Sequence, residues 1–227
     1  MKYDYTLKTN GERAKLVSHD VALNDGMPGR ATFVVESAVS LSGTAFFSFG
    51  VDGRQQQGQF YGYIERSTPA GNGVQTIFCR EKSNMLEMPV KLALRNVTLK
   101  EVLIKVKEIT GLGFDLPAVD YAAKKVPYFI NTGNGFHLIK ALGDVFGISD
   151  YLWQQRRDGL IYVGSWKDGH WPDTPINIPA AVLDKQLATQ SAEIMAVPGL
   201  RPNYLLNGNR LTSVRMIDAK MVISWKR

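Results

Sequence analysis

VPGLRPNYLLNGNRLTSVRMIDAKMVISW, residues 197–225, is the stretch that decides the fold of this chain. It contains a short apolar strand at residues 204–206, the dipeptide Asn207-Gly208 and a second strand at residues 210–217. Asn-Gly between apolar runs predicts a hairpin, because a type I′ turn needs positive φ at both central residues. After another turn, residues 221–225 form the last strand. The stretch predicts a closing antiparallel β-meander, which is an element of architecture and carries no chemistry of its own.

The first part of the chain, residues 1–84, has the pattern of an all-β domain. Short strands separated by turn signals are typical of a small barrel or sandwich. We expect strands at residues 31–36, 43–50, 57–65 and 74–80. Cys79, the single cysteine, lies in the last of these. It excludes an intramolecular disulfide, and we expect a buried, inert thiol, because a reactive one needs a basic and partly exposed setting.

Residues 85–165 change to a helical pattern. Thr98 and Glu101 form a predicted capping box, and Gly111 is placed to end the helix in a left-handed conformation. Apolar residues recur at helical spacing between them and again 36 residues later, where Gly147 matches Gly111. The matching apolar sets are Val102, Leu103, Val106 and Ile109, and Leu138, Ile139, Leu142 and Val145. The pattern predicts a compact α+β unit with two helices on a small sheet.

The chain is therefore predicted to be an α+β protein that is mainly β. Small antiparallel β-barrel-type domains at residues 1–84 and 166–227 flank an inserted two-helix α+β unit at residues 85–165. The final strands either close the first barrel or build a second one. A terminal strand docked in a sheet is a common way to hold a chain end.

Composition limits the classes of function. The formal net charge of +6 suggests nucleic acid, but 27 basic and 21 acidic residues are spread over all three segments. Nucleic-acid binding usually concentrates basic charge in one patch, so DNA binding is disfavoured. No apolar run approaches the ~20 residues of a membrane-spanning helix. The first residues lack an apolar segment, so we expect no secretory signal.

No motif in the sequence carries recognisable chemistry. Gly133-Asn134-Gly135 resembles the start of a dinucleotide-binding turn, but Leu138 replaces the third glycine, and a strand-to-helix turn capped by Asn134 explains it better. His19, His137 and His170 share no metal-ligand spacing and are expected to be ordinary surface or satisfied histidines. We therefore expect no catalytic residue, no metal site and no cofactor. A pair of carboxylates brought together in space would still allow a hydrolase.

Aromatic residues crowd the last third of the chain. Trp153 and Trp225 lie in predicted strands and are expected in the core, since tryptophan is highly buried on average. Trp166 and Trp171 lie among prolines and glycines. For these two, a contact between subunits or domains is as plausible as a place in the core, because aromatic residues are enriched at interface hot spots.

Three stretches of the chain, residues 20–80, 96–117 and 197–225, together resemble a known family. They are similar to the tail (baseplate) hub proteins of long-tailed bacteriophages, including the late-control D-type proteins and the hub part of type VI secretion spikes. The likeness rests on the strand and turn order, on NVTLKEVLIKVKEITGLGFDLP, and on the proline–arginine–proline stretch with its final meander. Asn203 departs from the pattern, because a glycine is common at that place. The chain is also shorter than most hubs, so we expect no appended lytic or fibre-binding domain.

The resemblance implies a structural, non-enzymatic role in the virion. Hub proteins form a homotrimeric ring that joins the tail tube to a central spike or fibre and surrounds the DNA-exit channel. The implied partners are the distal tail or tube protein, the tape-measure protein, the spike or fibre, and DNA in transit. The protein would sit at the tail tip, after assembly in the host cytoplasm. Candidate interface residues are Trp166, Trp171, Arg201 and Tyr204.

Two alternatives stay open from the sequence. The first is a small cell-wall-degrading hydrolase of a phage tail. The second is a secretin-like ring module, because the helix-strand module of the middle region also resembles short secretin N-terminal domains. The second is disfavoured by the expected lack of a secretory signal.

Overall fold

The computed structural model describes residues 1–179 and 183–226 and divides the chain into two compact units. Unit 1 combines Met1–Glu81 with Asp173–Arg227, and unit 2 is Lys82–Pro172. The predicted fold class is confirmed: most of the chain is β, and an α+β unit is inserted into it. The chain passes between the units at 81/82 and 172/173, where 84/85 and 165/166 were expected.

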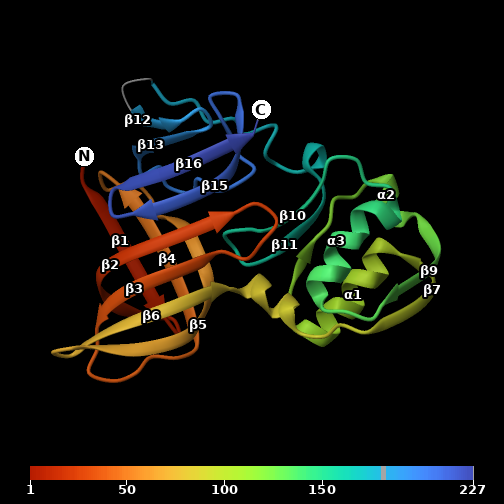
Figure 1. Cartoon of the computed structure of the whole chain (residues 1–227), viewed down its shortest axis with the longest axis horizontal. Coiled ribbons are helices and arrows are strands. Elements are labelled where there is room, and N and C mark those ends of the chain that lie inside the picture. The colour runs from red at the N-terminus through yellow and green to blue at the C-terminus, as the bar shows by residue number, and fades with distance from the viewer. Residues whose placement is uncertain (180–182, 227) are drawn as a thin grey trace. The chain divides into compact units, whose positions relative to one another are not determined.

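Six antiparallel strands of unit 1 form a closed barrel (Figure 1). They follow the order β1-β4-β5-β6-β3-β2, and pairing of β1 with β2 closes the ring. Alternate side chains point inward, as the period of a strand requires, and fill the interior. Fully buried members of this core include Leu7, Phe33, Phe47, Phe60 and Cys79. The strands are β1 (Tyr3–Thr9), β2 (Glu12–Asn24), β3 (Arg30–Glu36), β4 (Thr44–Val51), β5 (Gln57–Gly71) and β6 (Val74–Glu81).

The last strands of the chain continue the sheet of this barrel. The predicted meander is confirmed, with positive φ at Asn207 and Gly208. β15 pairs with residues 20–24 of β2, and β16, β13 and β12 follow outward. Buried side chains of β13, β14, β15 and β16 share one apolar core with the barrel. These strands are β12 (Leu183–Ala188), β13 (Ser191–Met195), β14 (Leu205–Leu206), β15 (Asn209–Ile217) and β16 (Lys220–Lys226).

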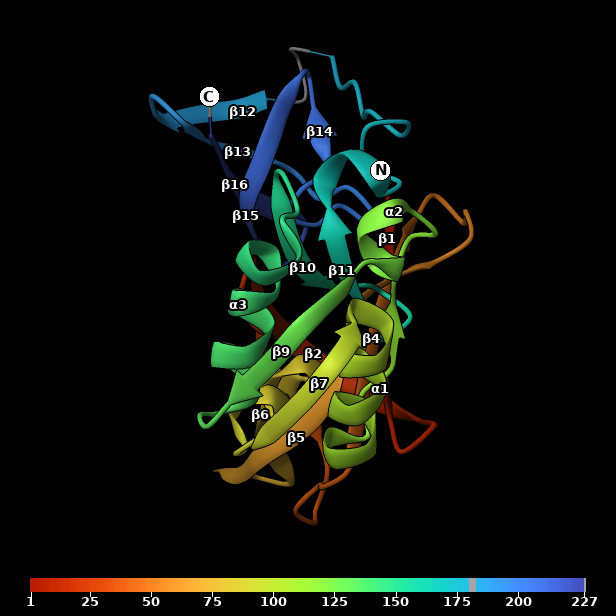
Figure 2. The same ribbon diagram turned by 90° about the vertical axis from the view of Figure 1, so that its right-hand side faces the viewer.

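Unit 2 contains the two predicted helices, α1 (Leu99–Thr110) and α3 (Gly135–Phe146), and a short helix, α2 (Asp120–Ala123). The capping box is present, and both long helices end at a glycine in the left-handed conformation. The prediction of one small sheet is wrong, because the strands form two: β10-β11-β8, and β7-β9 (Figure 2). Sequence spacing does not fix which strands pair. The strands are β7 (Leu92–Thr98), β8 (Phe114–Asp115), β9 (Lys125–Asn131), β10 (Tyr151–Gln155) and β11 (Ile161–Ser165), with 3₁₀ turns at Lys82–Glu87 and Trp166–Asp168.

The core of unit 2 lies between the helices and the two sheets. The first three members of each predicted apolar set are buried, whereas the fourth members, Ile109 and Val145, are 39% and 38% exposed. Trp153 lies in this core, as predicted, and Phe136 packs against its ring. Within the described residues, no helix combines the length and apolarity needed to cross a membrane.

Candidate functional site: a buried ion pair and an open strand pair

The four predicted interface residues lie in different settings. Trp171 is 2% exposed and meets the Tyr162 ring edge-on at a centroid distance of 4.9 Å. Arg201 is 4% exposed, whereas Trp166 and Tyr204 are half-buried. Arg201 and Trp171 are therefore held inside the chain, and Trp166 and Tyr204 retain exposed surface.

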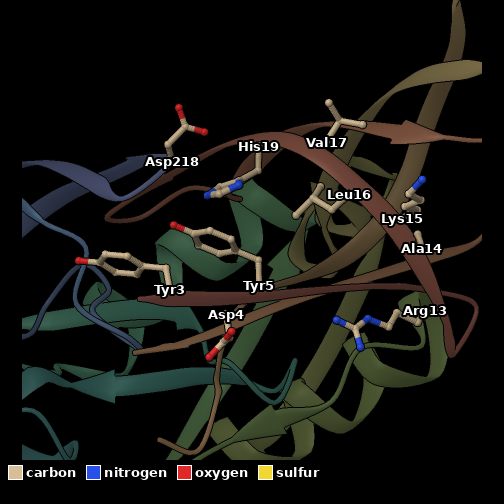
Figure 3. Close-up of a pocket in the computed structure, with 10 residues that line it drawn as sticks. All are labelled: Tyr3, Asp4, Tyr5, Arg13, Ala14, Lys15, Leu16, Val17, His19 and Asp218. Carbon is tan, nitrogen blue, oxygen red and sulfur yellow. The ribbon is translucent and has the colours of Figure 1, made fainter. Parts of the chain in front are cut away.

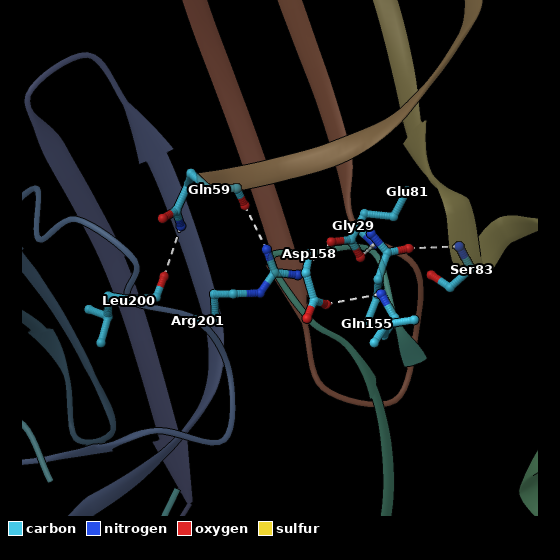
Figure 4. A network of polar contacts seen from close by, with 9 residues as sticks. Gly29, Gln59, Glu81, Ser83, Gln155, Asp158, Leu200 and Arg201 are labelled. Carbon is cyan, nitrogen blue, oxygen red and sulfur yellow. Dashed lines mark hydrogen bonds and ion pairs between the residues drawn. The ribbon is translucent and has the colours of Figure 1, made fainter. Parts of the chain in front are cut away.

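Arg201 forms a buried ion pair with Glu81 at the end of β6 (Figure 4). The Arg201 Nη2 donates to Glu81 Oε1 at 2.5 Å, and the other carboxylate oxygen accepts from the Gly29 N–H at 2.7 Å. A side chain at position 29 would meet Leu23 at 2.4 Å and the Glu81 carboxylate at 2.9 Å. Glycine is needed there because only a bare backbone brings its N–H this close to the carboxylate.

Gln59 of β5 completes this network. Its backbone carbonyl accepts from Arg201 Nη1 at 2.6 Å, and its side-chain Nε2 donates to the Leu200 carbonyl at 2.8 Å. Two strands of the barrel, β5 and β6, thus hold the segment around Arg201. A buried charge is tolerated when it is paired and hydrogen-bonded. The network holds in place the residues around Arg201, which lead into the closing meander.

A second polar site lies where β1 and β2 separate; we call it the open strand pair and define it as residues 3–6 of β1 and 15–19 of β2. In the part of the chain that the structure describes, β1 and β2 pair over residues 7–9 and 12–14 alone, next to their hairpin turn. Beyond that, the two strands diverge (Figure 3). A cavity of about 580 Å³ occupies the opening, within the ~300–1,000 Å³ range of ligand sites.

The free edge of β1 faces this cavity. Asp52 N donates to the Lys2 carbonyl and Asn10 N donates to the Thr44 carbonyl, so even-numbered residues of β1 bond to the β4 side. Because N–H and C=O groups alternate in direction along an antiparallel strand, those of Tyr3 and Tyr5 point toward β2. The structure assigns them no strand partner there.

A β-bulge brings His19 into the opening. The pairing of β2 with β3 shifts between Leu16 and Ser18, so inward-facing positions change from Ala14 and Leu16 to His19. Extra residues of this kind re-aim the side chains that follow them. The His19 ring lies 4.7 Å from the ring of Tyr5. It is 5% exposed, and its Nε2 is buried without a hydrogen-bond partner.

Burial also shapes the protonation of this site. Desolvation lowers the pKa of His19, and the carboxylate and backbone of Asp218 oppose that shift. Desolvation raises the pKa of Tyr5 to about 12, with smaller contributions from Tyr3 and Asp218. At neutral pH the rings lining the cavity are therefore uncharged.

Charged side chains are sorted by sign around the opening. Arg13 and Lys15 lie at the hairpin end, and Asp4 and Asp218 lie at the other end, beside Tyr3 and His19 (Figure 3). Lys15 binds Glu36 at 2.5 Å, while Arg13 is exposed. The arrangement provides backbone donors and acceptors, aromatic surface, and positive and negative side chains at opposite ends. These are the features of a recognition site.

Sequence reasoning missed this site. It treated His19 as an ordinary histidine, whereas the structure buries it with an unpaired nitrogen. The alternation of Lys15, Val17 and His19 places all three on one face of an ideal strand, so the bulge that separates them left no clear signal. The buried, inert Cys79 was predicted correctly, and burial raises the pKa of its thiol to about 12.

Comparison with known sequences identifies a phage relative. No family model matches the chain. It is 29% identical over 228 residues to an uncharacterized 58.7 kDa protein of Haemophilus phage HP1. That alignment covers 99% of this chain and 42% of the phage protein, so the chain spans less than half the length of its relative.

Comparison with solved structures shows where else the fold occurs. The 43 kDa tail protein of prophage MuSo2 from Shewanella oneidensis aligns over 100% of this chain and 98% of its own, with a TM-score of 0.71 and 10% identity. A tail protein from Neisseria meningitidis MC58 aligns over 100% and 97%, with a TM-score of 0.67 and 11% identity. The E. coli c3393 protein, a type VI secretion component, aligns over 96% and 75%, with a TM-score of 0.64 and 9% identity. The chain therefore has a fold that also occurs in tail proteins and in a secretion component.

Proposed function

We propose that this protein is a non-enzymatic structural component of a bacteriophage tail tip. The observation that carries the proposal is the agreement between a fold shared end to end with tail proteins and a sequence relative in a phage. In detail, the protein forms a homotrimeric hub ring that joins the tail tube to the central spike or fibre and surrounds the DNA-exit channel. The six-stranded barrel and the continuing strands supply the wall of that ring.

The proposed contacts between subunits or tail proteins involve Trp166 of unit 2 and Tyr204 of unit 1. Both are half-buried aromatic side chains, which suit interface anchors. Arg201 and Trp171 support these contacts from inside the chain, because they are buried there already.

Immunogold electron microscopy of purified particles tests the location. Antibody raised against this chain is expected to label the distal end of the tail, whereas antibody against the major capsid protein labels the head. Label absent from particles, with the protein free in the lysate, would contradict a virion role. Clearing of a cell-wall suspension by the purified chain would then favour the hydrolase.

Sedimentation equilibrium of the purified chain measures the number of subunits in the oligomer. If the isolated chain is a monomer, the oligomer is instead taken from phage particles from which the other tail proteins have been stripped. A trimer is expected, and Trp166→Ala or Tyr204→Ala is expected to weaken it. Val39→Ala, which truncates an exposed apolar side chain of a loop, is the matched control. A stable dimer, or equal weakening by all three variants, would contradict the proposed ring contacts.

A further inference from the structure

We propose that the open strand pair is a docking site for one extended segment of a partner protein, which adds as a strand along the free edge of β1. The inference rests on the geometry of unit 1 and holds whether or not the tail role is correct. Strand addition to an exposed sheet edge is a general mode of peptide recognition, in which backbone hydrogen bonds supply affinity and alternate side chains supply specificity.

The backbone of β1 selects an extended occupant. Residues 3–6 pair with β4 on one side, and on the other side the N–H and C=O groups of Tyr3 and Tyr5 face the cavity. Unpaired edges are normally blocked by charge, proline or a covering element because they attract other strands. Here residues of β2 and Asp218 of the β15–β16 turn line the cavity beside this edge.

His19 supplies an independent observation at the same place. His19 is part of the cavity lining, and its Nε2 is buried without a hydrogen-bond partner. A buried polar atom without a partner calls for an explanation, of which a ligand is one. A strand beside Tyr5 would bring backbone and hydroxyl groups to this nitrogen and satisfy it.

The charges give the occupant a direction. Arg13 favours an acidic residue at the hairpin end, where Lys15 is already paired with Glu36, and Asp4 and Asp218 favour a basic residue at the other end. Antiparallel pairing is the more stable arrangement, and β1 runs toward the hairpin. The occupant therefore runs from an acidic N-terminal residue to a basic C-terminal one, with β-branched residues between them.

Amide hydrogen exchange on the isotope-labelled full chain tests the proposal with a synthetic peptide. The probe is the capped heptapeptide Glu-Val-Thr-Val-Thr-Val-Lys. Without it, the amides of Tyr3 and Tyr5 are expected to exchange faster than those of Asp4 and Thr6, which bond to β4. Saturating peptide is expected to slow Tyr3 and Tyr5 at least ten-fold and to shift the His19 ring resonances. The same peptide with N-methylated valines is expected to do neither.

Three variants locate the peptide. Arg13→Glu is expected to weaken binding about ten-fold, whereas Arg66→Glu, at an exposed position on β5, leaves it unchanged. His19→Phe keeps the ring contacts and is expected to bind the peptide more weakly. The amide spectrum of this variant shows directly whether it remains folded.

Four results would overturn the proposal. Tyr3 and Tyr5 amides as slow as Thr6 in the free monomer would show a paired edge. Unchanged exchange rates at millimolar peptide would show that no strand binds, and protection by the N-methylated peptide would show binding without strand pairing. Protection that appears only as the chain self-associates would identify a second copy of this chain as the occupant.

Discussion

Arg201 and His19 are buried to the same degree in the same unit, yet the ends of their side chains differ in pairing. Arg201 is 4% exposed and its two terminal nitrogens bind Glu81 and the Gln59 carbonyl, whereas His19 is 5% exposed and its Nε2 has no partner. Burial alone therefore does not distinguish a structural polar group from a functional one. The pairing of the buried group does, because a paired buried charge is tolerated while an unpaired atom destabilises the fold.

The largest effect is expected from breaking the buried ion pair of Arg201 and Glu81. Arg201→Ala leaves the Glu81 carboxylate buried without its cation, and removal of one partner of such a pair costs about 3–5 kcal/mol. Urea unfolding followed by the NMR signals of unit 1 measures the free energy of unfolding. The double variant Arg201→Met with Glu81→Gln is the control, since it removes both charges and is expected to lose less. A loss below about 1 kcal/mol for Arg201→Ala would mean that the ion pair is not buried in solution.

A smaller effect is expected from Gln59. Gln59→Met keeps the volume of the side chain but leaves the buried Leu200 carbonyl without its donor. The expected loss is about 1–3 kcal/mol, measured in the same unfolding experiment. Gln55→Met is the control, because Gln55 lies at an exposed position just before β5. Equal effects of the two variants would refute a specific role of the Gln59 amide.

The unpaired site is expected to respond in the opposite direction. His19→Phe removes the orphaned nitrogen, together with the interaction of the ring with the Asp218 backbone, and retains the ring contacts with Tyr5 and Phe47. The free energy of unfolding at pH 7 is expected to rise by about 1 kcal/mol, since an unsatisfied buried group is destabilising by ~1–3 kcal/mol. A clear loss of stability would show that His19 already has a partner in solution.

The pH dependence sharpens the same contrast. The pKa of His19 is lowered by burial, so below pH 6.5 the unfolded chain binds a proton that the folded chain does not. The stability of the native protein is then expected to fall as the pH drops below 6.5. His19→Phe is expected to flatten that slope between pH 6.5 and 5.5, measured by unfolding across this range. His170, whose pKa is also lowered, contributes equally to both proteins. Identical slopes would contradict a buried, neutral His19.

The smallest effect is expected from an exposed ion pair on the same sheet. Arg215 and Asp20 approach to 2.6 Å across β15 and β2, but their side chains are 56% and 36% exposed. Arg215→Ala is expected to cost about 0.2–1 kcal/mol, less in high salt. Unfolding in low and high salt measures this difference. A loss as large as that of Arg201→Ala would remove the distinction between buried and exposed pairs.

Local signals in the sequence were reliable where one turn or cap decides the conformation. Asn207-Gly208, the capping box at Thr98 and the helix-ending Gly111 are all found as predicted. Each depends on residues a few positions apart, whose backbone preferences are strong. They fixed the elements, but not how the elements pair.

The pairing between strands that are distant along the chain could not be predicted from the sequence. Nothing local shows that β15 joins β2, or that the α+β unit has two sheets. The role of Arg201 shares this limit, because its partner Glu81 lies 120 residues away. His19 was missed for a related reason: one bulge inverts the facing of all later residues in a strand, and its place depends on tertiary contacts.

The pairing of β2 with β15 sets an order of events as the chain leaves the ribosome. Asp20 lies opposite Ile217, so the edge of β2 that β15 covers stays unpaired until residue 217 has been made, although β3 pairs with the other edge early. Unit 2 contains only residues 82–172 and can fold in the interval. Non-local strand pairing is slow and leaves edges exposed to aggregation. The inserted unit is therefore completed first, and a nascent chain that stalls before β15 is the species most in need of a chaperone.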